Sequence, residues 1–351
     1  MMCCLPTVLL VAAFGAILAC FKLGSARPRK RTHDPSKSLP YLMALAAWLK
    51  LADADLTLLL KSKFGRPIAT LKGKVIWITG ASSGIGEYLA YELAKVGSRL
   101  VLSGTNLENL ELVKNNCLGF GKDKGTEVLV LPFSICDFSS HSAQLQKVLD
   151  HFGKLDILVN NAGRSQRASF EEIPVEIDKE MFDCNVFGAI SLTRVVVKYF
   201  KEKGVQGHVV VTSSTAGKLG APFSATYTGS KHALQGYFEC LRLEGVILGG
   251  LDVTITCPGP VFSRIRERAF TATPGKLYNM KDTPKSRLMP TERCAHLIAV
   301  AIANKMDEVW ISQNPILLTM YLAQYVPSIF RNYVMKLLFT KERVMKLREG
   351  Q

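Results

Sequence analysis

The stretch VIWITGASSGIGEYLA at residues 75–90 decides the fold of this chain. Its apolar start at 75–79 predicts a buried strand, and the helical spacing of Ile85, Leu89 and Leu93 predicts a helix directly afterwards. Glycines at such a bend let the backbone approach a pyrophosphate, and the first amides of the helix attract its negative charge. A glycine triplet alone would be weak, since tight turns also favour Gly. Because this triplet lies between a predicted strand and a predicted helix, it predicts a dinucleotide site.

Short apolar runs alternate with helical patterns over the following 200 or so residues, as in βαβ units with a parallel sheet. The predicted strands are 75–79, 100–103, 128–131, 157–160, 209–212, 253–256 and 309–312. We therefore predict an α/β fold, a Rossmann-like doubly wound parallel sheet of about seven strands.

The composition fits one catalytic domain with appendages. The chain has 351 residues, 48% of them hydrophobic, which suffices for a large core. Its nine cysteines include no C-x-x-C pair, so we predict neither a disulfide framework nor a metal site. The net charge of +15 comes without any nucleic-acid-binding motif. Basic clusters lie beside apolar stretches, at 27–31 and 336–348, which favours a membrane surface as the partner over nucleic acid.

Residues 5–21 form an apolar stretch that would reach about 25 Å as a helix, slightly less than the ~30 Å hydrocarbon core. We predict an uncleaved membrane anchor, because the basic cluster follows the stretch; a cleaved signal peptide is the alternative. The positive-inside rule places the basic cluster, and with it the catalytic domain, in the cytosol. A second apolar stretch at 39–49 could reverse this orientation, although we interpret it as an interfacial helix. The side of the membrane that holds the catalytic domain is therefore left undecided.

Four segments result from these patterns. Residues 1–24 are predicted as anchor or signal segment, 25–71 as a basic linker with the interfacial helix, and 72–313 as the NAD(P)-binding catalytic domain. Residues 314–351 are predicted as a C-terminal helix that lies on a membrane or packs against the core.

Several motifs together resemble the short-chain dehydrogenase/reductase family. The family's T-G-x-x-x-G-x-G motif is matched at 79–86, its N-N-A-G motif at 160–163 and its P-G motif at 258–259. The resemblance implies an oxidoreductase whose nicotinamide cofactor is bound by Thr79, Gly80, Ser82, Ser83, Gly84, Ile85, Gly86, Asn161, Ala162, Gly163, Tyr227, Lys231, Pro258, Gly259, Val261 and Ser263.

The family's catalytic Y-x-x-x-K pair is matched by Tyr227 and Lys231. The same spacing occurs at 91–95 and 199–203, but only Tyr227 has a Ser, Ser214, at the family's place upstream, at a strand end. The resemblance implies that Tyr227 moves the proton accompanying hydride transfer, that Lys231 lowers its pKa and holds the nicotinamide ribose, and that Ser214 orients the substrate oxygen. Asn185 would complete a proton relay. A one-place register error would exchange Ser214 with Ser213.

The choice of cofactor depends on the turn after the second strand. In this family an acidic residue there favours NAD(H) and a basic one NADP(H), whereas residues 103–106, SGTN, provide neither. Small polar side chains leave room for a 2′-phosphate, so we predict NADP(H) over NAD(H).

The runs 54–59, 230–234, 257–261 and 308–312, together with Arg167, look like the branch of the family near the microsomal hydroxysteroid dehydrogenases. This resemblance implies an endoplasmic reticulum membrane location with a single anchor. It also implies a small lipophilic carbonyl or alcohol substrate of the steroid, retinoid or quinone class, and an apolar lid with basic edges at 262–289 suits such a molecule. The family commonly forms homodimers. A catalytically silent, cofactor-binding membrane scaffold is the alternative function.

Overall fold

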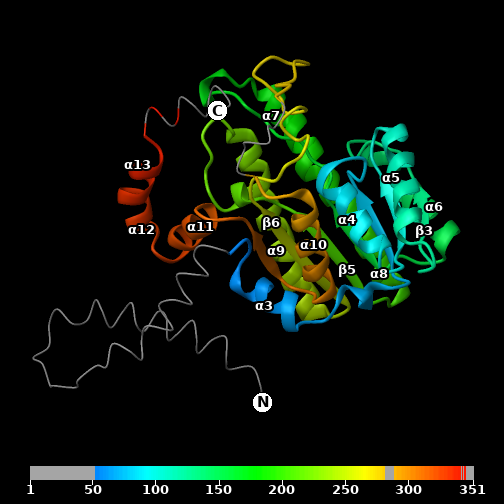
Figure 1. Ribbon diagram of the computed structural model, residues 1–351. Coiled ribbons are helices and arrows are strands. Elements are labelled where there is room, and N and C mark those ends of the chain that lie inside the picture. Colours follow the sequence, from blue (N-terminus) through cyan, green and yellow to red (C-terminus); the bar gives the residue numbers. More distant parts are fainter. Residues whose placement is uncertain (1–51, 281–287, 341, 343, 345–351) are drawn as a thin grey trace, which may run out of the picture. The chain divides into compact units, whose positions relative to one another are not determined.

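Seven parallel strands form one sheet in the order β3-β2-β1-β4-β5-β6-β7. The computed structural model describes residues 52–280, 288–340, 342 and 344 (Figure 1). The strands are β1 Val75–Thr79, β2 Arg99–Ser103, β3 Glu127–Val130, β4 Ile157–Asn160, β5 Gly207–Thr212, β6 Leu251–Pro258 and β7 Glu308–Ile311. The predicted seven-stranded, Rossmann-like parallel sheet is therefore confirmed.

Helices cover both faces of this sheet, because successive side chains of a strand point to opposite sides. In β1, Ile76 and Ile78 join the core beneath one helix layer, whereas Val75 and Trp77 join the core beneath the other. The first layer contains α4 Gly84–Ala94, α5 Leu107–Phe120 and α10 Thr291–Ala303. The second layer contains α6 His141–Phe152, α8 Gly188–Lys203 and α9 Ala225–Leu248.

The strand order reverses between β1 and β4. From β1 the chain adds β2 and β3 on one side, and then β4 to β7 on the other. Ligands of open α/β sheets bind in the crevice that such a reversal leaves at the carboxyl ends of the strands. The glycine turn at 79–86 follows β1 at this point.

The stretch before β1 packs against the end of the sheet. Asp55 accepts hydrogen bonds from the Leu58 amide at 2.9 Å, at the start of α3 (Leu56–Phe64), and from the Trp310 amide of β7 at 2.8 Å. Asp53 forms a two-pronged ion pair with Arg293 of α10, at 2.7 and 3.1 Å. The compact unit begins at Ala52, so this part of the stretch that we predicted as linker lies within it.

Asp55→Ala is expected to lower the free energy of unfolding by about 1–3 kcal/mol, because it removes a helix cap and leaves the Trp310 amide without its acceptor. Urea denaturation of the two proteins measures the difference. Asp150→Ala, on the exposed side of α6, is the matched control and should change stability by less than about 0.5 kcal/mol. Equal effects of the two substitutions would contradict the role given to Asp55.

The C-terminal segment is broken into α11 Ile316–Tyr325, α12 Pro327–Ile329, the π-helical η6 Phe330–Val334 and α13 Met335–Leu338. Leu317 and Met320 are buried, and Tyr321 packs edge-on against Trp310, so α11 belongs to the core. Tyr333 and Leu337 are exposed farther on. Within the described part of the chain, no helix is both long and apolar enough to cross a membrane. The predicted anchor at 5–21 and interfacial helix at 39–49 lie outside the described residues.

Candidate active site

The glycine turn after β1 is a backbone cradle that larger residues would fill. Gly80 and Gly84 have φ angles of +66° and +62°, which favour glycine. A Cβ on Gly80 would lie 2.8 Å from the Cα of Ala162, and one on Gly86 would lie 2.5 Å from the carbonyl oxygen of Gly80. The side chain of Ser83, just before α4, makes no capping bond to the first turn of that helix. The cradle therefore suits a dinucleotide pyrophosphate at the start of α4.

Gly86→Ala is expected to weaken cofactor binding by at least about tenfold, because the added methyl group cannot fit against fixed backbone of the turn. Isothermal titration with NADPH and NADH measures the change. Gly119→Ala is the matched control, since Gly119 lies in α5 with open space around its Cα. If Gly86→Ala binds cofactor as tightly as this control, the turn is not the pyrophosphate site.

The N-N-A-G stretch after β4 fixes this turn from the side. The Thr79 hydroxyl accepts hydrogen bonds from the amides of Asn161 and Ala162, both at 3.1 Å. The Asn161 side chain donates to the carbonyl oxygens of Thr79 and Gly80, at 3.1 and 3.2 Å. Ser82 is buried at the same turn, beside Gly104 after β2, whereas Ile85 lies in the first turn of α4.

A third part of the predicted cofactor site is the P-G turn after β6, with the first residues that follow it. Pro258 ends β6, and Gly259 has no room for a side chain, since a Cβ would lie 2.3 Å from the Ser312 hydroxyl. Val261 is buried, and the Cβ of Ser263 lies 3.4 Å from the position of a Cβ on Gly84. The predicted cofactor residues after β1, β4 and β6 thus come together at the switch point.

Ser214 and Tyr227 meet at the carboxyl end of β5. Ser214 follows that strand and Tyr227 lies in the first turn of α9, close enough that the Ser214 hydroxyl lowers the pKa of the phenol. The Ser214 hydroxyl also donates to the Pro258 carbonyl at 3.2 Å. Ser213 is turned away: its hydroxyl donates to the Lys231 carbonyl and accepts from Gln235, both at 3.1 Å. The geometry therefore favours Ser214 over Ser213 as the residue facing substrate.

Lys231 is buried beside the tyrosine. Its Nζ lies 5.7 Å from the centroid of the Tyr227 ring and donates to the Thr212 carbonyl at 2.8 Å. Burial lowers the pKa of Lys231 to about 8, and the nearby thiols of Cys184 and Cys257 oppose this shift. The ammonium is thus held by β5, one turn of α9 from the phenol.

The pKa of Tyr227 differs from our expectation. The sequence predicted a phenol whose pKa Lys231 depresses, but burial raises the pKa of Tyr227 above its usual value, and the Ser214 hydrogen bond and the Arg167 charge oppose that rise only in part. The physical reason is that burial removes the phenol from water, which disfavours its charged form.

Asn185 lies in a π-helical turn, η4 Asp183–Phe187, between α7 Val175–Phe182 and α8. Its side chain accepts from the Arg164 amide at 2.8 Å and donates to the Arg164 carbonyl at 2.9 Å and the Ser230 hydroxyl at 3.0 Å. Asn185 and Lys231 both approach Gly163, because a Cβ there would lie 3.2 Å from Oδ1 and 3.5 Å from Nζ. Such π-turns are frequent at functional sites.

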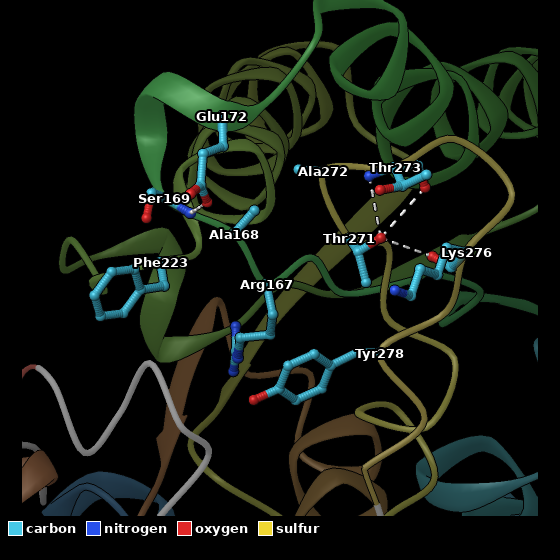
Figure 2. Close-up of a pocket in the computed structure, with 10 residues that line it drawn as sticks. All are labelled: Arg167, Ala168, Ser169, Glu172, Phe223, Thr271, Ala272, Thr273, Lys276 and Tyr278. Atoms are coloured by element: carbon cyan, nitrogen blue, oxygen red, sulfur yellow. Dashed lines mark hydrogen bonds between the residues drawn. The ribbon is translucent and has the colours of Figure 1, made fainter.

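Arg167 was not among the predicted site residues, although its charge faces Tyr227. It lines a cavity of about 270 Å³ (Figure 2). The other lining residues are 168–169, Glu172, Phe223, the lid residues 271–273, Lys276 and Tyr278. No periodicity or motif spacing marks an isolated Arg in a loop, so only its closeness to the N-N-A-G turn could have drawn attention to it.

A glycine cradle at the switch point and a Ser, Tyr and Lys cluster after β5 together define a nicotinamide-dependent oxidoreductase of the short-chain type. A family model described as short chain dehydrogenase matches residues 74–273, and the chain belongs to this family. It is 44% identical to dehydrogenase/reductase SDR family member 7 of Mus musculus and 42% identical to that of Homo sapiens. Each match covers 82% of this chain and 84% of the relative.

A solved structure of a short chain dehydrogenase/reductase from Burkholderia phymatum in complex with NAD is also similar. It is 26% identical, with a TM-score of 0.64, over 75% of this chain and 96% of that one. An alcohol dehydrogenase from Thermococcus sibiricus, complexed with 5-hydroxy-NADP, shares the fold at 24% identity and a TM-score of 0.60, over 70% of this chain and 99% of that one.

Proposed function

We propose that this protein transfers a hydride between NADP(H) or NAD(H) and a lipophilic carbonyl or alcohol of the steroid, retinoid or quinone class, with Tyr227 as the acid and base. The observation that carries the proposal is the grouping of Ser214, Tyr227 and Lys231 at the carboxyl end of the central strand β5, with the Lys231 Nζ 5.7 Å from the centroid of the Tyr227 ring. In support of the proposal, Ser214 bonds to Pro258 of the P-G turn that we predicted as part of the cofactor site.

The side chains divide the proton chemistry among them. The bound nicotinamide supplies or accepts the hydride. Tyr227 donates a proton to the oxygen that becomes a hydroxyl, and Ser214 donates a hydrogen bond that orients this oxygen. The positive charge of Lys231 stabilises the tyrosinate that remains after Tyr227 has given up its proton. Asn185 holds the Arg164 backbone and Ser230, which keeps α9 and the loop after β4 in register.

The preference for NADP(H) rests on the turn after β2. The Ser103 hydroxyl accepts from the Trp77 indole at 2.8 Å, and the Asn106 Oδ1 accepts from the Asn109 amide at 2.8 Å, so both side chains already have a partner within the protein. Thr105 is exposed and uncharged. Without a carboxylate to repel it, a 2′-phosphate is accommodated here.

The test is oxidation of NADPH and of NADH by the detergent-purified full chain against a panel of steroid, retinoid and quinone carbonyls. Turnover with a lower KM for NADPH supports both parts of the proposal. Cofactor binding without turnover of any carbonyl, or of any alcohol in reverse, would favour the catalytically silent membrane scaffold instead.

We also propose an endoplasmic reticulum membrane location, with the stretch 5–21 as a single anchor. In support, the exposed side chains of Ile329, Tyr333 and Leu337 lie near Arg331 and Lys336, a combination typical of helices that rest on an anionic membrane. Alkaline carbonate extraction of microsomes should leave the full chain in the pellet. A chain that begins at residue 25 should be released by salt, and release of both by carbonate alone would rule out the anchor.

A homodimer through α8 and α9 is the further part of this proposal. Val246 and Ile247 on α9 are 73% and 80% exposed, which is unusual for neighbouring apolar side chains of a packed helix. Sedimentation of the detergent-solubilised protein should give a dimer, and Ile247→Glu should give a monomer. A monomeric wild type would disprove the pairing.

A further inference from the structure

The cavity lined by Arg167 lies where three loops meet, each following the carboxyl end of a central strand. Arg167 belongs to the loop after β4, Phe223 to the segment between β5 and α9, and Lys276 and Tyr278 to the lid after β6. Figure 2 shows the Arg167 guanidinium beside the Tyr278 ring. In open α/β sheets, loops at this edge form the ligand site.

The backbone of Arg167 is fixed from two sides. Its amide donates to the Phe270 carbonyl at 2.9 Å, and the Phe270 amide donates to the Ser165 carbonyl at 2.8 Å. On the other side, the Ala168 amide donates to the Phe223 carbonyl at 3.1 Å. The backbone that carries the Arg167 side chain is therefore hydrogen-bonded both to the lid and to the segment before α9.

The guanidinium itself is only partly satisfied. Its Nη1 donates to the Gln166 carbonyl at 3.0 Å and to the Ser224 hydroxyl, and neither acceptor carries a charge. No carboxylate of the described residues forms an ion pair with it. Burial lowers the pKa of Arg167, so the cation is partly removed from water. A guanidinium has five N–H donors, and the Arg167 side chain that carries them lines the cavity.

The lid around the cavity adds further positive charge. Its described part, 262–280, contains Arg264, Arg266, Arg268 and Lys276 but only one acidic residue, Glu267. Lys276 lines the cavity together with Arg167. The acidic residue that lines the cavity, Glu172, accepts from the Ser169 amide at 3.2 Å. An incoming group with oxygen acceptors matches the two basic side chains of the lining, whereas a hydrocarbon end would give the Arg167 donors no partner.

We propose that Arg167 determines substrate specificity by binding a second oxygen acceptor, a carboxylate or a carbonyl, on the part of the substrate away from the reacting carbon. The inference rests on the proposed function, since Tyr227 and Ser214 hold the reacting oxygen. The substrate class is thus a lipophilic carbonyl with an acceptor at its other end. Sites built to hydrogen-bond a substrate group reject analogues that lack it.

Three ketones of similar shape provide the test: para-isopropylacetophenone, para-diacetylbenzene and para-acetylbenzoate. Calorimetry measures their binding to the full chain saturated with oxidised cofactor, which has no hydride to transfer. We expect the diketone and the keto acid to bind at least about tenfold more tightly than the isopropyl compound. A stronger gain for the keto acid than for the diketone identifies a carboxylate as the preferred acceptor.

Arg167→Met should remove this difference, and Arg167→Lys should keep part of the preference for the keto acid. Ser224→Ala removes a partner of Arg167 without removing its charge, and should leave the order of affinities unchanged. Loss of the preference in Ser224→Ala to the same degree as in Arg167→Met would show that Arg167 only braces the loop. If Arg167→Met does not fold, the order of affinities for the three ketones in the wild type and in Arg167→Lys still tests the specificity role of Arg167.

Binding also separates this inference from the proposed function. Equal affinities of the wild type for the three compounds, including no binding of any, would overturn the specificity role even if other carbonyls turn over. The expected order of affinities without any NADPH oxidation would instead support Arg167 as an acceptor site and count against the reductase.

Discussion

Replacing Tyr227 with Phe is expected to lower kcat for carbonyl reduction by about 10²–10⁴-fold, because the forming hydroxyl oxygen loses its proton donor. The ring stays in place, so packing of the first turn of α9 should persist. Cofactor affinity should change by less than about threefold, since the phenol hydroxyl belongs to α9 and not to the glycine turn before α4. Steady-state NADPH oxidation and calorimetric cofactor binding measure the two quantities separately.

Tyr237→Phe is the matched control, on the same helix α9 but 48% exposed and away from the cluster. It should retain the wild-type kcat. A Tyr227→Phe enzyme within about threefold of the wild type would show that the proton comes from another group. Loss of cofactor binding in this variant would instead indicate damage to the site.

Local patterns predicted most of the scaffold. Each of the seven predicted strands is present, because a strand covered by helices on both faces must be apolar throughout and its run of residues is visible in the sequence. Bounds shifted most for β6, which extends over Leu251–Pro258 instead of 253–256, since hydrogen bonds to β5 and β7 prolong it at both ends. Such extensions depend on neighbours and not on composition.

Long-range contacts were harder to predict. Asp55 looks like an ordinary helix cap in sequence, and its second bond to Trp310 depends on the docking of β7. The Tyr227 pKa follows mainly from burial, which residue spacing does not reveal. Arg167 acquires its place only when the lid pairs with the loop after β4.

Carbonyl reduction by the wild type is expected to decline as the pH rises through about 8, where the buried Lys231 loses its proton. Below this pH the ammonium stabilises the tyrosinate that forms when Tyr227 gives up its proton, and above it that help is lost. Burial raises the pKa of Tyr227 above its usual value of about 10, so the phenol stays protonated across this range. The decline is thus assigned to Lys231.

Lys231→Met should lower kcat/KM about a hundredfold and remove the decline near pH 8. The Lys231 Nζ lies 5.7 Å from the centroid of the Tyr227 ring, and opposite charges at about this separation attract by about 3 kcal/mol at an effective dielectric constant of about 20, which corresponds to that factor. Lys231→Arg keeps its charge at every accessible pH, so its activity should stay level where the wild type declines. Profiles of kcat/KM at saturating cofactor, between about pH 6 and 10, make the comparison. A Lys231→Arg enzyme that declines with the wild type near pH 8 would assign the titration to another group, because a guanidinium has no proton to lose in that range.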